Sequence, residues 1–263
     1  MNSKLSVFET MQEMLRLSAK HFRLLLVVGA AQSVPGIASQ VSSQVMSQLG
    51  FAALGSLLAF VLYIFWMVVD AACRAATLGV LSEPAPELVT TSMRTAVRTR
   101  SWTLFRISIL LALIAIPFGI VIGLGASLLK FGTSLVGTCG SVILGLLFLI
   151  FMKYALADPL AVVKKIGARE SLKVSWHMTR GHFGYVLGCY LLLGIPIVVV
   201  DCLLPNLGFT DVGSAVGAVL IQYVTSVLTT PWIVLSWVMY LHVTAADAQP
   251  EELAPPTSAP EVA

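Results

Sequence analysis

The sequence predicts an all-α polytopic membrane protein with six transmembrane helices. Hydrophobic residues make up 57% of the 263 residues and charged residues 11%, whereas a soluble domain carries about 25% charged residues. The mean hydropathy of +0.91 points the same way. Crossing a hydrocarbon core takes about 20 apolar residues in a helix, whereas barrel strands alternate over ~10 residues. Six stretches meet the helical requirement, at 22–41, 51–72, 102–129, 135–156, 183–204 and 213–243.

A repeated pattern precedes the first, third and fifth of these stretches. Each begins with a cation followed by an aromatic residue, in Lys20-His21-Phe22, Arg100-Ser101-Trp102 and Arg180-Gly181-His182-Phe183. A proline follows each cation after 15, 17 and 16 residues, at Pro35, Pro117 and Pro196. Each proline is predicted to kink its helix because it removes a backbone hydrogen bond. The matching offsets predict one unit used three times, at about 5–72, 85–156 and 162–245.

Each unit is predicted to start with an amphipathic helix. Apolar side chains share one helical face in all three copies: Phe8, Met11, Leu15 and Ala19; Val89, Met93, Ala96 and Val97; Leu172 with Trp176 and Val174 with Met178. Apolar stripes with basic flanks are typical of helices that lie in the membrane interface. The alternative is that these segments extend the transmembrane helices into the cytoplasm. Each unit would therefore contain an interfacial helix, a Pro-kinked span, a short external turn and a return span.

The distribution of positive charge predicts the orientation. Fifteen of the sixteen Lys and Arg residues fall at the N-terminus, in 74–106 or in 153–180, and Lys130 is the exception. Threading six helices in order puts those segments on one side, so the positive-inside rule places both termini in the cytoplasm. The N-terminus lacks the features of a cleavable signal peptide. We expect one helical membrane domain over 1–245 and a disordered, acidic, Pro-rich tail over 246–263.

Three ionisable residues near the ends of spans are candidates for a site within the membrane. Asp70 and Arg74 are four residues apart and can pair on one helical face. We interpret them as a structural ion pair in preference to a proton relay. Lys153 lies near the end of the fourth span and can extend to the headgroups. The sequence places no charge in the middle of a span, which weighs against an ion-coupled transporter.

No catalytic or metal-binding motif is found. The sequence lacks G-x-S-x-G, H-E-x-x-H, a P-loop and any spaced Cys/His ligand set. We therefore predict no catalytic residue, no cofactor and no metal. Nucleic-acid binding is not expected either, because anionic headgroups explain the basic residues more economically.

Residues 157–183 form the most distinctive segment. It is dense in Lys and Arg, Trp176 suits an interface anchor, and Asp158 is placed to cap the helix that follows. Four pieces of it resemble a family of bacterial six-span membrane proteins: Asp158-Pro159, Glu170-Ser171-Leu172-Lys173, Ser175-Trp176 and Thr179-Arg180-Gly181. The family includes the YciC-like proteins and the membrane domain attached to some glycerophosphoryl diester phosphodiesterases. The resemblance implies a bacterial inner-membrane protein without an established activity, and it brings no catalytic residues.

Three functions are compatible with these features. The favoured one is a non-catalytic inner-membrane protein that binds or organises anionic lipid, or supports envelope homeostasis. The interface residues would be Lys20, Arg98, Arg100, Lys164, Lys165, Arg169, Lys173, Trp176 and Arg180. The alternative is a transporter, channel or lipid scramblase with the proline kinks lining a path. An intramembrane enzyme would need two convergent ionisable groups, such as Asp70 with Lys153. A homo-oligomer or a membrane-protein partner stays open.

Overall fold

The computed structural model describes residues 5–48, 51–83, 89–128, 145–204 and 223–252. The regular structure of these residues is entirely helical, which confirms the predicted all-α class. The named helices are α1 (Val7–Lys20), α2 (Phe22–Gln48), α3 (Ala52–Leu81), α4 (Val89–Leu128), α6 (Ala157–Val163), α7 (Ala168–Gly181), α8 (Phe183–Leu204) and α10 (Pro231–Glu252). Shorter helical segments cover 145–152 and 223–229.

Four helical stretches of the described residues are long and apolar enough to cross a membrane. They are Leu57–Leu81, Thr91–Phe118, Gly145–Val163 and Tyr223–Ala248. A fifth is added if Val7–Lys20 and Phe22–Ala38, which meet at 84°, form one broken span. The predicted fifth stretch contains a shorter apolar helix, Phe183–Ile197. The structure therefore contains four or five candidate spans, and six remains a prediction.

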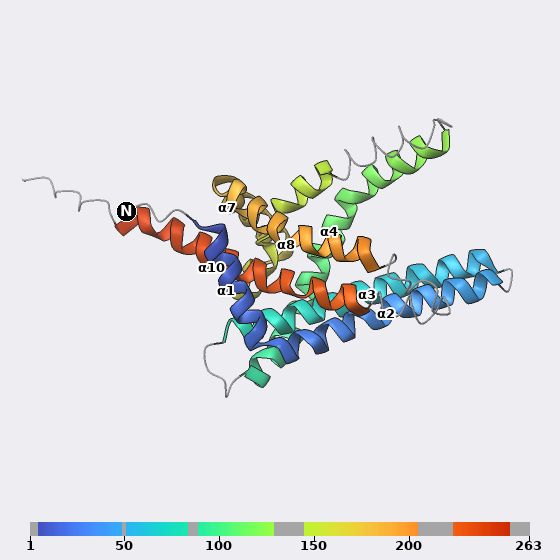
Figure 1. Ribbon diagram of the computed structural model, residues 1–263, viewed down its shortest axis with the longest axis horizontal. Coiled ribbons are helices and arrows are strands. Elements are labelled where there is room, and N and C mark those ends of the chain that lie inside the picture. The colour runs from blue at the N-terminus through green and yellow to red at the C-terminus, as the bar shows by residue number, and fades with distance from the viewer. Residues whose placement is uncertain (1–4, 49–50, 84–88, 129–144, 205–222, 253–263) are drawn as a thin grey trace, which may run out of the picture.

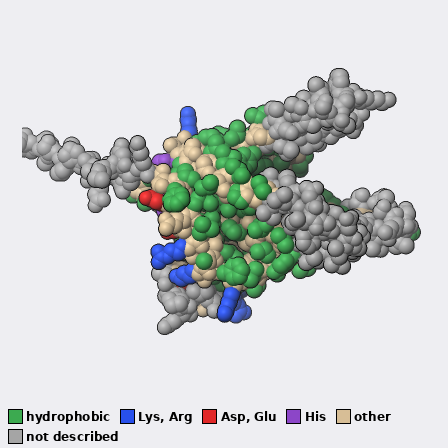
Figure 2. Space-filling view, in the orientation of Figure 1, with side chains coloured by type: hydrophobic (Ala, Val, Ile, Leu, Met, Phe, Trp, Pro, Cys, Tyr) green, Lys and Arg blue, Asp and Glu red, His purple; other side chains and the backbone are tan. Residues whose placement is uncertain are grey.

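The surface of the molecule fits a lipid environment. Within the apolar 18-residue stretch of Leu57–Leu81, only 17% of the residues are buried, and the same share is buried in Thr91–Phe118. Large side chains such as Phe60 and Phe65 on α3 are exposed, and exposed apolar surface on this scale marks an interaction with protein or membrane. Figure 2 shows hydrophobic side chains across the middle of the molecule, with charged and histidine side chains gathered at the left-hand end.

The core is built around α10. In Tyr223–Ala248, 56% of the apolar window is buried, and Val234, Leu235, Val238 and Met239 of α10 are inaccessible to solvent. Figure 1 shows α2 and α3 as a long antiparallel hairpin, with α1 crossing beside α10. The last of the described helices thus occupies the centre of the bundle.

Two glycines allow close helix approach. A Cβ at Gly29 of α2 would lie 2.9 Å from the Cα of Val227, and a Cβ at Gly79 of α3 would lie 2.6 Å from the Cβ of Ala96 on α4. Real Cβ atoms do not come so close, so both positions require glycine as the helices now pack. A Cβ at Gly184 of α8, by contrast, would meet nothing within 4 Å.

The three cation-aromatic steps adopt two different conformations. Helix α1 ends at Lys20 and α2 starts at Phe22 after the 84° bend. Likewise α7 ends at Gly181 and α8 starts at Phe183. In the second copy, however, α4 continues for 40 residues through Arg100-Ser101-Trp102. The predicted separate interfacial helix is therefore wrong for this copy, and residues 89–100 extend the span.

Local contacts explain why α4 does not break. Ser101 Oγ donates to the carbonyl of Val97 at 2.6 Å, one helical turn earlier. Trp102 stacks on Phe105 with ring centroids 5.1 Å apart, and the Arg106 guanidinium lies 5.3 Å from the Trp102 ring. The two Trp102 contacts, at i,i+3 and i,i+4 spacing, favour an uninterrupted helix, whereas the Ser101 bond to a carbonyl four residues earlier does not add to that preference. The third step has Gly181 instead, which favours a helix end.

The structure gives a partial test of the predicted proline kinks and of the predicted disordered tail. Pro35, Pro117 and Pro196 each lie inside a helix, in α2, α4 and α8. Helix α10 continues to Glu252, so residues 246–252 of the predicted disordered tail are helical. The segment starts with Ala246 and Ala248 around Asp247; alanine is the strongest helix former, and Asp247 contacts His182 at 3.0 Å. Residues 253–263 lie outside the described part of the chain.

Candidate functional site

Arg74 joins three helices through a network of charged and polar contacts. Its Nε lies 2.9 Å from Asp70 Oδ2 within α3, and its Nη1 lies 2.5 Å from Asp158 Oδ2 at the start of α6. Its Nη2 contacts the hydroxyl of Ser108 on α4. The predicted Asp70–Arg74 pair is confirmed, whereas the second carboxylate was not predicted. The side chains are only 15–20% exposed, so two largely buried carboxylates share one guanidinium.

Asp158 has a different role from the helix cap that the sequence suggested. The N-cap of α6 is Leu156, and Asp158 lies in the first turn, where a negative charge is favourable. Its carboxylate is then free to pair with Arg74. Pro159 follows in the same turn and is buried. Its missing N–H costs little there because first-turn N–H groups have no partner within the helix.

Among the cavities of the described residues are one of about 540 Å³ and one of about 430 Å³. The second one lies beside Asp70. Its lining includes Gln32 of α2, Trp66, Asp70 and Arg74 of α3, Ser226, and Trp232 of α10. Gln32 Nε2 donates to Asp70 Oδ1 at 2.8 Å. Trp232 Nε1 is a buried donor that has no acceptor among the described residues. The lining of the cavity thus combines polar, charged and aromatic side chains.

Lys153, the third predicted intramembrane residue, lies elsewhere. Its Nζ is 4.3 Å from the centre of the Phe183 ring and 5.6 Å from that of the Trp176 ring. No ion pair joins Lys153 to Asp70. The structure therefore does not bring together the pair that an intramembrane enzyme was expected to use, and Lys153 acts as a cation held by aromatic rings.

Ser175, which belongs to the predicted family motif, stabilises a turn over 153–156 at the end of the fourth predicted span. The buried Ser175 hydroxyl accepts from the Leu156 N–H at 3.2 Å and donates to the Lys153 carbonyl at 3.0 Å. It satisfies two backbone groups of the turn over 153–156, between the helix 145–152 and α6. Trp176 is exposed, beside Tyr154 and Lys153. The predicted Leu172–Trp176 stripe is therefore split, because Leu172 is buried and Trp176 is not.

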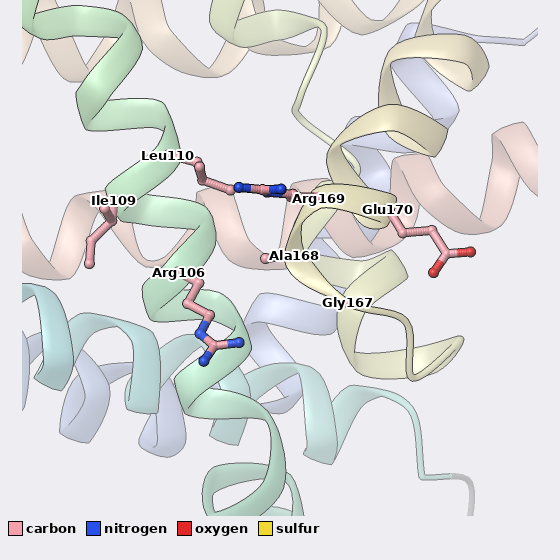
Figure 3. Close-up of a pocket in the computed structure, with 7 residues that line it drawn as sticks. All are labelled: Arg106, Ile109, Leu110, Gly167, Ala168, Arg169 and Glu170. Carbon is pink, nitrogen blue, oxygen red and sulfur yellow. The ribbon is translucent and has the colours of Figure 1, made fainter.

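The 540 Å³ cavity lies between α4 and the start of α7. Arg106, Ile109 and Leu110 line it from α4, and residues 167–170 line it from α7. Figure 3 shows the Arg169 guanidinium extending toward Leu110, while the Glu170 carboxylate points away from α4. Arg169 was among the predicted interface residues. Arg106 was missed, although it lies four residues after Trp102 in a basic segment, which was the available signal.

The other predicted interface residues are distributed over several elements. Most are exposed and Arg100 is half-buried; the exposed ones are Lys20, Arg98, Lys164, Lys165, Lys173 and Arg180. Glu170 and Gly181 of the family motif are exposed as well. Lys165 adopts a left-handed backbone with φ 55° in the connection between α6 and α7. Arg98 lines a separate cavity of about 600 Å³ on α4 together with Met93, Arg94 and Val97, so the structure does not gather all predicted residues into one site.

A second polar cluster was not predicted. His242 Nε2 lies 2.7 Å from Glu13 Oε2, and His242 Nδ1 lies 2.9 Å from Thr10 Oγ1 and 3.3 Å from the Tyr185 hydroxyl. The order carboxylate, imidazole, hydroxyl is that of a hydrolase triad. Thr10 is inaccessible to solvent, however, and none of the cavities described above reaches it. We interpret the cluster as a clamp that ties α1 to α8 and α10.

In the part of the chain that the structure describes, no group of three or more His, Cys, Asp or Glu side chains is arranged to hold a metal ion. Comparisons with protein-family models, curated proteins and solved structures find no match for this chain.

Proposed function

We propose that this chain is a non-catalytic, multi-pass protein of the bacterial inner membrane that binds anionic phospholipid on its cytoplasmic side. The observation that carries the proposal is the cavity between α4 and α7, which combines two arginines with an apolar wall. Binding or organising anionic lipid there would support envelope homeostasis.

The chemistry of the cavity suits a phosphodiester headgroup. Guanidinium groups bind phosphate through paired N–H donors, and Arg106 and Arg169 line the cavity from opposite sides. The Glu170 carboxylate also lines the cavity but points away from α4, and two positive charges against one negative leave the lining net positive. The volume of about 540 Å³ lies in the range of small-ligand sites, roughly 300–1,000 Å³. The headgroup therefore fits, and the acyl chains must extend outside.

A track for the acyl chains continues along α4. Ile109 and Leu110 line the cavity, and Leu113 and Ile116 follow as exposed apolar side chains at helical spacing. Leu113 and Ile116 lie in the candidate span Thr91–Phe118. A lipid with its phosphate at the arginines would thus place its hydrocarbon against an apolar helical face.

Helix α1 supports a location of the arginine-rich end in the membrane interface. Phe8 and Leu15 are 75% and 62% exposed, and they are seven residues apart on one face, while Met11 and Met14 face the protein. Such exposed apolar residues on a helix lying at 84° to the next one suit an interfacial position. Six spans with both termini cytoplasmic, and membership of the YciC-like family, are parts of the same proposal.

The alternative of a transporter, channel or scramblase is favoured by one observation, the polar cavity beside Asp70. The prolines contribute less than expected, because Pro117 and Pro196 are exposed and line neither cavity. Solute flux and lipid scrambling by the reconstituted protein test this alternative directly.

The lipid proposal is tested with the variant Arg106→Gln/Arg169→Gln. Native mass spectrometry of protein extracted from mixed nanodiscs measures retention of phosphatidylglycerol against phosphatidylcholine. We expect wild type to retain the anionic lipid and the double variant to lose roughly tenfold or more in preference per arginine, because hydrogen bonds to charged groups contribute about 1.5–3 kcal/mol.

The matched control is Arg16→Gln/Arg23→Gln, which removes the same charge from exposed positions of α1 and α2 that do not line this cavity. It should reduce the preference much less. Equal losses in the two double variants would mean that diffuse charge, and not the cavity, attracts the lipid.

A further inference from the structure

The cavity beside Asp70 contains more negative than positive charge. Asp70 and Asp158 both contact Arg74, and in the described residues no second Lys or Arg lies within 4.0 Å of either carboxylate. With all three groups ionised, the cluster therefore has a net charge of −1.

Asp70 is the carboxylate whose negative charge is less completely neutralised. The guanidinium uses Nη1 for Asp158 at 2.5 Å and Nη2 for the Ser108 hydroxyl, which leaves Nε for Asp70 Oδ2 at 2.9 Å. The other oxygen of Asp70 accepts from the neutral amide of Gln32. Asp70 lines the cavity whereas Asp158 does not. The incompletely neutralised carboxylate is thus the one that borders open space.

Such an excess charge is costly where Asp70 lies, inside the candidate span Leu57–Leu81. Ionisable side chains within a membrane are retained when a partner compensates them. The cavity offers room for that partner, with a volume of about 430 Å³, within the range of small-ligand sites.

The rest of the lining suits an organic cation that carries a hydrogen-bond acceptor. Trp66 and Trp232 come from two different helices, α3 and α10, and line the same space. Indole rings attract ammonium groups more strongly than other aromatic rings do. Trp232 Nε1 is in addition a buried donor without an acceptor in the described chain, which a hydroxyl or ester oxygen on the ligand would satisfy.

We propose that this cavity binds the ammonium group of a small amino alcohol, either free or as the headgroup of a lipid, against the Asp70 carboxylate. Trp66 and Trp232 contact the cation and Trp232 Nε1 donates to its oxygen. The site is separate from the arginine cavity and takes a ligand of opposite charge, so it does not depend on the proposed function.

Ethanolamine hydrochloride is the probe, added at neutral pH to the full-length protein in a maltoside detergent. Tryptophan fluorescence reports binding, and NaCl at equal ionic strength is the reference. We expect saturable binding to wild type and at least tenfold weaker binding to Asp70→Asn, because that substitution removes the charge partner. Trp66→Phe should weaken binding roughly threefold to tenfold through loss of the stronger cation–π contact.

Two controls separate the site from general effects. Glu170→Gln removes an exposed carboxylate at the start of α7 and should leave the affinity unchanged, as should Lys173→Gln, which removes an exposed positive charge from the same helix. Asp70→Asn should fold, because the amide has the same shape and removes the excess charge. If Asp70→Asn does not fold, the affinity of Trp66→Phe for ethanolamine still tests the proposal, since that variant retains the Asp70 carboxylate.

Nanodiscs distinguish the two sources of the ammonium group. If phosphatidylethanolamine in a phosphatidylglycerol bilayer blocks ethanolamine, and wild type but not Asp70→Asn retains that lipid, the ligand is a lipid headgroup. Equal ethanolamine binding with and without phosphatidylethanolamine identifies a soluble amine. An equal response to NaCl, undiminished binding by Asp70→Asn, or failure of both ethanolamine and the lipid to bind would overturn the proposal.

Discussion

Replacing Arg74 by methionine tests whether the shared guanidinium holds α3, α4 and α6 together. The substitution removes the cation between Asp70 and Asp158 and leaves two carboxylates largely buried, with side chains about 20% exposed. Breaking one buried ion pair costs about 3–5 kcal/mol because the remaining charge has no partner. Because the two carboxylates keep some solvent exposure, we expect the lower end of this range, a loss of about 3 kcal/mol in the free energy of unfolding.

A matched variant separates lost contacts from stranded charge. Asp70→Asn/Arg74→Met/Asp158→Asn removes all three charges, and replacing a buried ionic triad by neutral groups is often neutral or stabilising. We expect its stability to return to within about 1 kcal/mol of wild type. Arg74→Lys should lie between, because an ammonium keeps the charge but cannot contact both carboxylates and Ser108 as a planar fork does.

Thermal unfolding in detergent, followed by tryptophan fluorescence, measures these effects. A loss of 3 kcal/mol corresponds to a fall in Tm of about 6–12 °C, at roughly 2–4 °C per kcal/mol for a chain of this size. The reasoning fails if Arg74→Met melts with wild type, or if the triple variant melts below Arg74→Met.

Three further predictions concern packing and charge. Gly79→Ala should destabilise the protein by about 1–3 kcal/mol in the melting assay, because its Cβ would lie 2.6 Å from that of Ala96. Adding Ala96→Gly to this variant should restore the Tm. Gly184→Ala is the control and should not lower the Tm, because a Cβ there meets nothing within 4 Å. Ser175→Ala should cost about 1–3 kcal/mol in the same melting assay, since it strands the Leu156 N–H, whereas Ser175→Thr keeps the hydroxyl and should recover part of that loss. Charge reversal to Glu of Lys164, Lys165 and Lys173, three exposed members of the predicted interface residues, should weaken flotation with phosphatidylglycerol vesicles in detergent-depleted samples. Its effect on stability should stay within about 1 kcal/mol. An unchanged lipid preference would contradict a contribution from these three lysines.

What the sequence predicted correctly was local. The apolar stretches indicated helices, and the spacing of Asp70 and Arg74 indicated their ion pair. Contacts between distant residues carried no such signal: Arg74 and Asp158 are 84 positions apart, and Thr10 and His242 are 232 apart. The candidate site depends on those contacts, so its second carboxylate and its aromatic wall could not be predicted from periodicity.

The repeated steps show how a correct pattern can give an incorrect element. Residues 100–102 match the other two copies in charge, aromatic residue and distance to proline, yet α4 is continuous. The difference lies in the contacts of Trp102 with Phe105 and Arg106, which support the helix locally, whereas Gly181 does not. The close helix contacts at Gly29 and Gly79 likewise depend on residues of other helices, Val227 and Ala96.

The central position of α10 has a consequence for the order in which the protein is made. Its solvent-inaccessible side chains, Val234, Leu235, Val238 and Met239, belong to the last described helix, so the ribosome delivers the middle of the bundle after its periphery. The clamp between Thr10 and His242 likewise joins the first described helix to the last described one. The helices made before α10 therefore lack this packing partner while they are in the bilayer, and the bundle is complete only after α10 has been inserted.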